Sequence, residues 1–131
     1  MEDLLAGLNK PQQEAVLHTE GPLLVLASAG SGKTAVLTRR IVRLIREEKA
    51  TPSQILGVTF TNKAAGEMRQ RIDKMVGRKA HGLWLCTFHA AATRILRAEV
   101  SKAKTGRTPT FEILDSQGQL QVMRDIVKTS L

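Results

Sequence analysis

The chain has 131 residues, enough for one domain with its own hydrophobic core. Hydrophobic residues make up 42% of it and charged residues 24%, a balance that is typical of a folded soluble domain and excludes a largely disordered chain. There are 20 lysine and arginine residues against 12 aspartate and glutamate residues, so the formal charge is +8. This surplus favours a polyanionic partner, most simply nucleic acid, with a merely basic soluble domain as an equal alternative.

Nothing in the sequence predicts an exported or membrane-bound protein. The single cysteine, Cys86, excludes an intramolecular disulfide and suits a reducing intracellular setting. The N-terminus carries Glu2 and Asp3 and lacks the basic-then-apolar pattern of a signal peptide. The longest apolar stretch, residues 22–27, is too short to span a membrane. We therefore expect a cytoplasmic protein without a membrane partner.

A short helix is the first element that the sequence predicts, through Gln13 to about His18. Asn9 is a typical N-cap, because Gln12 stands three positions later, as in a capping box, and Pro11 lies in the first turn.

Three apolar runs are typical of strands, and they alternate with helical segments. The runs are residues 23–26, 55–60 and 83–87, and the first is typical of a strand that is covered on both faces. Their spacing requires crossover connections, so the strands should be parallel. The sequence therefore predicts an α/β fold with a parallel sheet and helices on both sheet faces.

Apolar periodicity and capping residues mark the helices between these strands. The first runs from Lys33 to about Glu48, and its arginines at positions 39, 40, 43 and 46 should form mostly a solvated face. Asn62 can cap the next helix, which Gly77 is placed to end.

The last part of the chain reads as a separate segment. A helix over residues 89–100 is followed by a polar, basic stretch at residues 101–110, which is a loop or a domain junction. A short extended piece at residues 111–114 leads to Asp115, which can cap a last helix.

The segment between the first predicted strand and the next helix has the pattern of a phosphate-binding loop. A preceding strand and a following helix are the context that this loop requires. Ala27 replaces the first glycine of the usual pattern, which is tolerable where φ is negative. The intact Gly-Ser-Gly-Lys-Thr sequence disfavours the alternative, a glycine-rich turn that only joins a strand to a helix. The residues of the loop are Ala27, Ser28, Ala29, Gly30, Ser31, Gly32, Lys33 and Thr34.

Each part of this loop has a chemical task. Gly30 and Gly32 let backbone N–H groups curl around a β-phosphate, and the following helix adds the positive end of its dipole. The Lys33 ammonium can reach between the β- and γ-phosphates, and the Thr34 hydroxyl can bind Mg²⁺. The sequence therefore predicts ATP and Mg²⁺ as cofactors. Nucleotide binding alone does not choose among kinases, GTPases, transport ATPases and helicases.

Three further segments accompany the loop in a specific order. They are residues 8–16, 59–68 and 87–89, and the second begins Thr-Phe-Thr-Asn-Lys-Ala-Ala directly at the end of a strand. Together with the loop, this set resembles the N-terminal part of UvrD/Rep/PcrA-type DNA helicases of superfamily 1. The resemblance covers essentially the whole chain.

The resemblance implies a fold, a division into domains and an activity. The fold would be a RecA-like P-loop NTPase fold, incomplete in these residues. Residues 1–100 would be the first part of the ATP-binding motor domain, and residues 101–131 would be the start of an inserted helical subdomain, after which the chain ends. The activity would be that of an ATP-dependent 3′-to-5′ DNA helicase, an ATP hydrolase that acts on single-stranded DNA in repair or replication.

The resemblance also assigns roles to single residues. Gln12 corresponds to a glutamine that reads the adenine edge, although a capping-box side chain is the stronger interpretation from the sequence alone. Phe60 would stack on a DNA base, or else be an ordinary core aromatic at a strand end. Asn62 and Lys63 would contact phosphate, or simply cap and solvate a helix. The residues implied to contact single-stranded DNA are Thr59, Phe60, Thr61, Asn62, Lys63, Thr87, Phe88 and His89.

Two departures from the family pattern limit what these residues can do. Ala35 stands where the family commonly has arginine, so one nucleotide contact is lost. No apolar strand is followed by paired acids, so the carboxylates that hold Mg²⁺ and activate water are missing, together with the arginine fingers. We therefore expect the isolated chain to bind ATP and single-stranded DNA without unwinding a duplex. The alternatives are a stand-alone P-loop nucleotide-binding or nucleotide-kinase module and a non-catalytic single-strand DNA binder.

Overall fold

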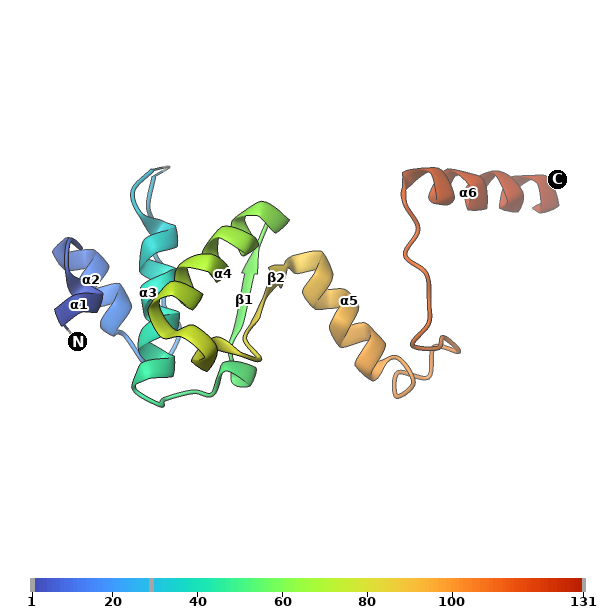
Figure 1. The fold of residues 1–131 in the computed structure, drawn as a ribbon. Coiled ribbons are helices and arrows are strands. Elements are labelled where there is room, and N and C mark those ends of the chain that lie inside the picture. The colour runs from blue at the N-terminus through green and yellow to red at the C-terminus, as the bar shows by residue number, and fades with distance from the viewer. Residues whose placement is uncertain (1, 29, 131) are drawn as a thin grey trace. The chain divides into compact units, whose positions relative to one another are not determined.

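The computed structural model describes residues 2–28 and 30–130. The chain divides into two compact units, Met1–Ala91 and Ala92–Leu131, with α5 (Phe88–Glu99) crossing the division (Figure 1). In the described part of the chain, no helix is both long and apolar enough to cross a membrane.

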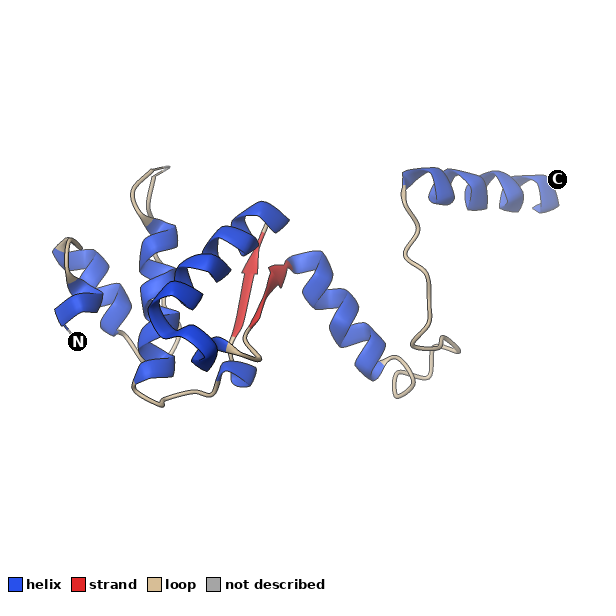
Figure 2. Cartoon of the chain, in the orientation of Figure 1, coloured by secondary structure: helices blue, strands red, loops and turns tan. Residues whose placement is uncertain are grey.

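The sheet of the first unit consists of two parallel strands, β1 (Leu56–Thr59) and β2 (Trp84–Thr87) (Figure 2). Their register pairs Leu56 with Trp84 and Thr59 with Thr87. The connection between them contains α4 (Asn62–Val76) and the 3₁₀ helix η2 (Gly77–Ala80). The prediction of an α/β fold with parallel strands is therefore confirmed.

The strand predicted at residues 23–26 is wrong, because residues 22–28 form no regular secondary structure. The side chains of this segment nevertheless alternate in exposure, as in an extended chain. Leu24 and Leu26 are 80% and 86% exposed, whereas Leu23 and Val25 are about half as exposed. Leu23 and Val25 line a cavity against α3 (Lys33–Arg46). A strand also needs a hydrogen-bonded neighbour, and the described residues supply no ladder partner to this segment.

The main core lies between α3, α4 and one face of the sheet. Its buried residues come from α1, α3, α4 and the segments around η2, and Leu85 of β2 packs against them. Gly57 lies at this face, where an added Cβ would come within 2.5 Å of the Leu85 side chain. The buried members are Leu4, Ile41, Val42, Ile45, Met68, Ile72, Ala80 and Leu83.

Helices on both sheet faces are not seen in the described residues. Gly57 is buried, whereas Leu56 points to the opposite face and is 48% exposed. The two strands have four residues each, so the sheet has little area that a second layer of helices could cover. The remaining elements of the first unit are α1 (Glu2–Leu5), α2 (Lys10–Leu17) and the 3₁₀ helix η1 (Pro52–Gln54).

Two of the predicted helix boundaries are confirmed, and one is wrong. Asn9 and Gln12 form the capping box of α2, because the Asn9 Oδ1 atom accepts from the Gln12 N–H at 3.0 Å and the Gln12 Oε1 atom accepts from the Asn9 N–H at 2.9 Å. Gly77 ends α4 with a φ of 59°. Thr61, not Asn62, caps the start of α4, because its Oγ1 atom accepts from the Ala64 N–H at 3.1 Å.

The arginines of α3 form a solvated face only in part, because Arg46 is exposed whereas Arg43 is buried. Each donates hydrogen bonds to carbonyl oxygens at or just beyond the C-terminal end of another helix. These carbonyls lack intrahelical partners and carry the negative end of the helix dipole, so guanidinium groups suit them. The pairs are Arg39 with Leu4 and Ala6, Arg40 with Ala15, Arg43 with Val16 and Leu17, and Arg46 with Met75.

The second unit contains the rest of α5 and the last helix, α6 (Ser116–Ser130). The predicted cap is confirmed, because the Asp115 Oδ1 atom accepts from the Gly118 N–H at 2.8 Å. The Arg97 guanidinium lies 5.8 Å from the centre of the Phe111 ring. The assignment of residues 101–131 to an inserted subdomain stays a prediction.

Candidate nucleotide-binding site and nucleic-acid interface

The predicted phosphate-binding loop lies directly before α3, which begins at Lys33. Gly30 and Gly32 adopt φ values of 78° and 86°, in the left-handed region where a side chain would be strained. Gly32 is the N-cap of α3, and no side chain caps the first turn. The N–H groups of this turn can therefore receive an anion. Ala29, also predicted to belong to the loop, lies outside the described residues.

The Lys33 ammonium is held at the loop by two of the loop's own carbonyls. Its Nζ atom donates to the oxygens of Ala27 and Ser28, both at 2.7 Å. The Ser28 oxygen also accepts from the Ser31 hydroxyl at 2.7 Å. Lys33 is exposed, so its charge is directed by these contacts and remains accessible to a ligand at the mouth of the loop.

Gln12 links the start of α2 to the phosphate-binding loop. Its Oε1 atom completes the capping box with Asn9, so the structural interpretation of this residue is confirmed. Its Nε2 atom donates to the Ser31 oxygen at 2.9 Å, a contact that sequence reasoning missed. The Gln12 side chain also lies close to the backbone of Gly32, since a Cβ on Gly32 would be 3.0 Å from the Gln12 Nε2 atom.

Gln12 and the loop share a cavity of about 360 Å³, within the size range of small-molecule sites. The structure thus brings together the two elements that were predicted separately to hold a nucleotide. The residues that line this cavity with polar groups include Asn9, Gln12, Ser28, Ser31 and Lys33.

Thr34 lies on the side of the loop that faces the sheet. It is exposed and lines a second cavity, of about 280 Å³, together with Lys33, Thr59, Phe60 and Thr61. A hydroxyl is a hard oxygen donor, so Thr34 fits the role of one Mg²⁺ ligand beside bound phosphates. The predicted nucleotide residues and the predicted DNA residues therefore meet in one cavity.

The residues that the sequence predicts to contact DNA lie at the edge where both parallel strands end. Thr59 and Thr87 are paired in register, and Phe60 and Phe88 follow them directly. The two rings lie 5.5 Å apart, centre to centre, with an interplanar angle of 51°. Phe60 is 91% exposed and Phe88 is 51% exposed, so the interpretation of Phe60 as a core aromatic is wrong. Their pairing follows from the strand register, which no local sequence signal reveals.

The polar residues at this edge have mainly local hydrogen bonds. The Thr59 hydroxyl donates to the Thr61 oxygen at 2.9 Å, and the Thr87 hydroxyl accepts from the Ala90 N–H at 3.3 Å. Asn62 and Lys63 are exposed in the first turn of α4, where the helix dipole also favours an anion. His89 is exposed in the first turn of α5.

Comparison with known proteins identifies the family. The family model for the UvrD/REP helicase N-terminal domain matches residues 8–131 of the sequence. The chain is 50% identical over 125 residues to the ATP-dependent DNA helicase PcrA of Bacillus subtilis (strain 168), covering 95% of this chain and 17% of that protein.

Two other relatives give the same result. A probable DNA helicase II homolog of Rickettsia conorii is 49% identical over 127 residues, which are 97% of this chain and 19% of the relative. The PcrA helicase of Staphylococcus aureus (strain Mu50) is 47% identical over 128 residues, with 98% and 17% covered. The chain thus spans less than a fifth of the length of these relatives. It belongs to the UvrD/REP helicase family and corresponds to the family's N-terminal domain.

Proposed function

We propose that this chain is the ATP-binding N-terminal part of an ATP-dependent DNA helicase that moves 3′ to 5′ on single-stranded DNA. It would act in DNA repair or replication in the cytoplasm. One observation carries the proposal: Lys33 lines both the cavity that it shares with Gln12 and the cavity that it shares with Phe60. The names of the relatives, ATP-dependent DNA helicase PcrA and DNA helicase II, support this activity.

ATP would enter the larger cavity with its adenine near Gln12 and its phosphates at the loop. The Gln12 amide can donate and accept at once, as an adenine edge requires, after releasing the Ser31 oxygen and the Asn9 N–H. The Lys33 ammonium would leave the carbonyls of Ala27 and Ser28 for the β- and γ-phosphates. Thr34 would hold Mg²⁺, which neutralises phosphate charge when bound.

Single-stranded DNA would lie along the edge that Phe60 and Phe88 mark. Their exposed ring faces offer a stacking platform, and stacking on aromatic side chains contributes about 1–3 kcal/mol per base. Lys63 and the N-terminal turn of α4 suit a DNA phosphate. The other residues in this proposal are Thr59, Thr61, Asn62, Thr87 and His89.

The shared cavity suggests how nucleotide and DNA binding would be coupled. Thr34 and the segment from Thr59 to Thr61 line the same space. A γ-phosphate and Mg²⁺ beside Thr34 would therefore change the surroundings of the segment that presents Phe60. The isolated chain would bind both ligands without useful turnover, because no apolar strand in these 131 residues is followed by paired acids that could complete the metal shell and orient water.

Measuring the affinity for a single-stranded oligonucleotide with and without a non-hydrolysable ATP analogue tests the proposal. We expect the affinity to change when the analogue is bound, because the two sites share a cavity. If the affinity for single-stranded DNA is the same with and without the ATP analogue, the result would support a non-catalytic single-strand binder instead. Nucleotide binding without any DNA binding would support a stand-alone P-loop module.

A further inference from the structure

Two sets of basic residues in the first unit differ in their contacts. The arginines of α3 are bound to backbone carbonyls, and the Arg69 guanidinium likewise donates to the Leu83 oxygen at 2.7 Å. A second set lies on the last turns of α4 and on η2, is exposed, and makes no side-chain hydrogen bond or ion pair with the described part of the chain. We call this set, Arg71, Lys74, Arg78 and Lys79, the α4 basic patch.

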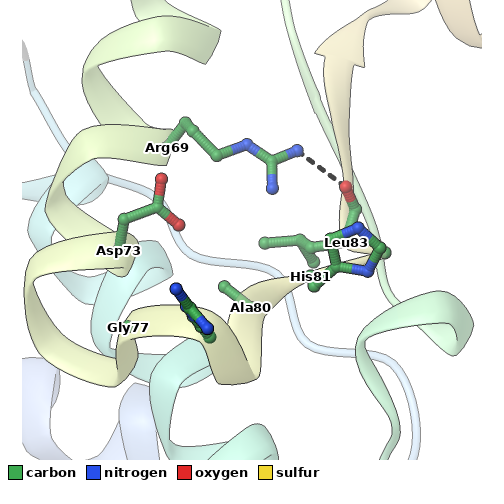
Figure 3. A pocket seen from close by; sticks show the side chains of 8 residues that line it. Arg69, Asp73, Gly77, Ala80, His81 and Leu83 are labelled. Atoms are coloured by element: carbon green, nitrogen blue, oxygen red, sulfur yellow. Dashed lines mark hydrogen bonds between the residues drawn. The ribbon is translucent and has the colours of Figure 1, made fainter.

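The α4 basic patch adjoins an open hollow at the edge where β2 begins. The hollow has a volume of about 620 Å³ and is lined by Arg69, Asp73, Arg78 and His81 (Figure 3). Leu83, which also lines it, precedes β2, whereas Phe88 follows β2. The length of a four-residue strand, roughly 13 Å, therefore separates this hollow from the aromatic edge.

The acidic groups near this patch do not neutralise it. Glu67 lies four positions before Arg71 on the same side of α4, and Asp73 reaches toward the hollow beside Arg69 (Figure 3). Neither carboxylate lies within ion-pair distance of a basic group in the described residues. Residues 67–81 thus contain five arginines and lysines but only two acids.

Stabilisation of the end of α4 does not account for this many cations. Basic groups near a helix C-terminus are favourable because of the dipole. The end of α4 already has partners, however, since Arg46 donates to the Met75 oxygen at 2.8 Å and the Gly77 N–H donates to the Asp73 oxygen. Four additional exposed cations therefore point to an external anionic ligand.

We propose that the α4 basic patch is a second nucleic-acid contact, which binds the phosphate backbone of duplex DNA. This inference rests on the proposed action of the protein on DNA. Among the described residues, no phenylalanine, tyrosine or tryptophan lines the hollow, and the single imidazole of His81 is not the paired-ring platform that Phe60 and Phe88 form for a single strand. A duplex instead presents one charge per about 1.7 Å of its axis, the dense anionic surface that a patch of cations binds. A duplex held here would be separate from the single strand on Phe60 and Phe88.

A triple variant of the whole chain, Arg71→Ala with Arg78→Ala and Lys79→Ala, tests the proposal. Its affinity for a blunt DNA duplex should fall on the order of tenfold or more at low salt. The slope of log affinity against log salt should become shallower by about 2.7, or about 0.9 for each phosphate contact. Its affinity for a short single-stranded oligonucleotide, and its melting temperature, should match those of the parent chain.

A second triple variant with the same change in charge is the control: Arg107→Ala, Arg124→Ala and Lys128→Ala, all in the second unit. It should lower duplex affinity by less than about twofold. Equal losses of duplex affinity in the two triple variants would overturn the proposal. So would a loss of single-strand affinity in the first triple variant that equals its loss of duplex affinity. Binding of the parent chain to anionic phosphatidylserine vesicles but not to duplex DNA would also overturn it. If the ATP analogue leaves single-strand affinity unchanged, the proposed function fails, and the duplex comparison still tests the patch.

Discussion

Phe60 illustrates how the role of one residue depends on where a strand stops. Its position after an apolar run is compatible with a core side chain, yet β1 ends at Thr59 and the Phe60 ring is 91% exposed. Gln12 illustrates the opposite case, because its capping role was readable from the spacing to Asn9. Its contact with Ser31 joins residues 19 positions apart in the chain, so no local pattern could predict it.

Replacing the exposed ring tests the stacking role directly. Phe60→Ala should weaken binding of single-stranded DNA by about 1–3 kcal/mol. Its melting temperature should hardly change, because a ring that is 91% exposed loses little burial. Thermal melting, followed by DNA titration, separates this result from a core role, for which about 3–5 kcal/mol of stability would be lost. A weakened melt with unaltered DNA affinity would reject stacking.

At the scale of elements, the sequence predicts best where periodicity and caps agree. Both strands and the helices α3, α4 and α5 lie within about two residues of their predicted positions. The segment at 23–26 was predicted as a strand because its composition is that of a buried strand, but pairing depends on neighbours that composition does not reveal. The contacts of the α3 arginines were missed for the same reason, because their acceptors lie up to 35 residues away.

Arg43 is the most deeply placed of these arginines, with 7% of the residue exposed. It joins α3 to the end of α2 and to Glu47, and its hydrogen bond lowers the pKa of the Glu47 carboxyl, with Lys49 adding to the effect. Arg43→Ala should reduce the free energy of unfolding by about 2–3 kcal/mol, because it leaves the carbonyls of Val16 and Leu17 without a charged donor.

Urea unfolding measures this loss. Arg71→Ala removes an exposed arginine from α4 and should change the free energy of unfolding by less than about 0.5 kcal/mol. Equal effects of the two variants would show that the contacts of Arg43 do not hold α2 against α3.

At the scale of the whole molecule, the basic residues behind the formal charge of +8 have different roles. Part of it neutralises helix ends inside the first unit, and part is exposed at the end of α4. Composition supports a nucleic-acid partner only weakly, whereas Lys33 lines both the cavity with the predicted nucleotide residues and the cavity with the predicted DNA residues, which supports the proposed function. The candidate site could be predicted from the sequence because its motifs are local, but its connection through one cavity could not.

Binding of MgATP by Lys33→Ala tests the central claim most directly. Lys33 is exposed, and its ammonium donates hydrogen bonds only to the loop among the described residues, so the variant should melt like the parent chain. Loss of a charge-assisted contact of about 1.5–3 kcal/mol should weaken binding of a fluorescent ATP analogue roughly 10- to 150-fold. Lys63→Ala, which removes another exposed lysine at a helix start, is the matched control and should bind the analogue unchanged. Unaltered affinity in Lys33→Ala, with an unaltered melt, would contradict ATP binding at this loop.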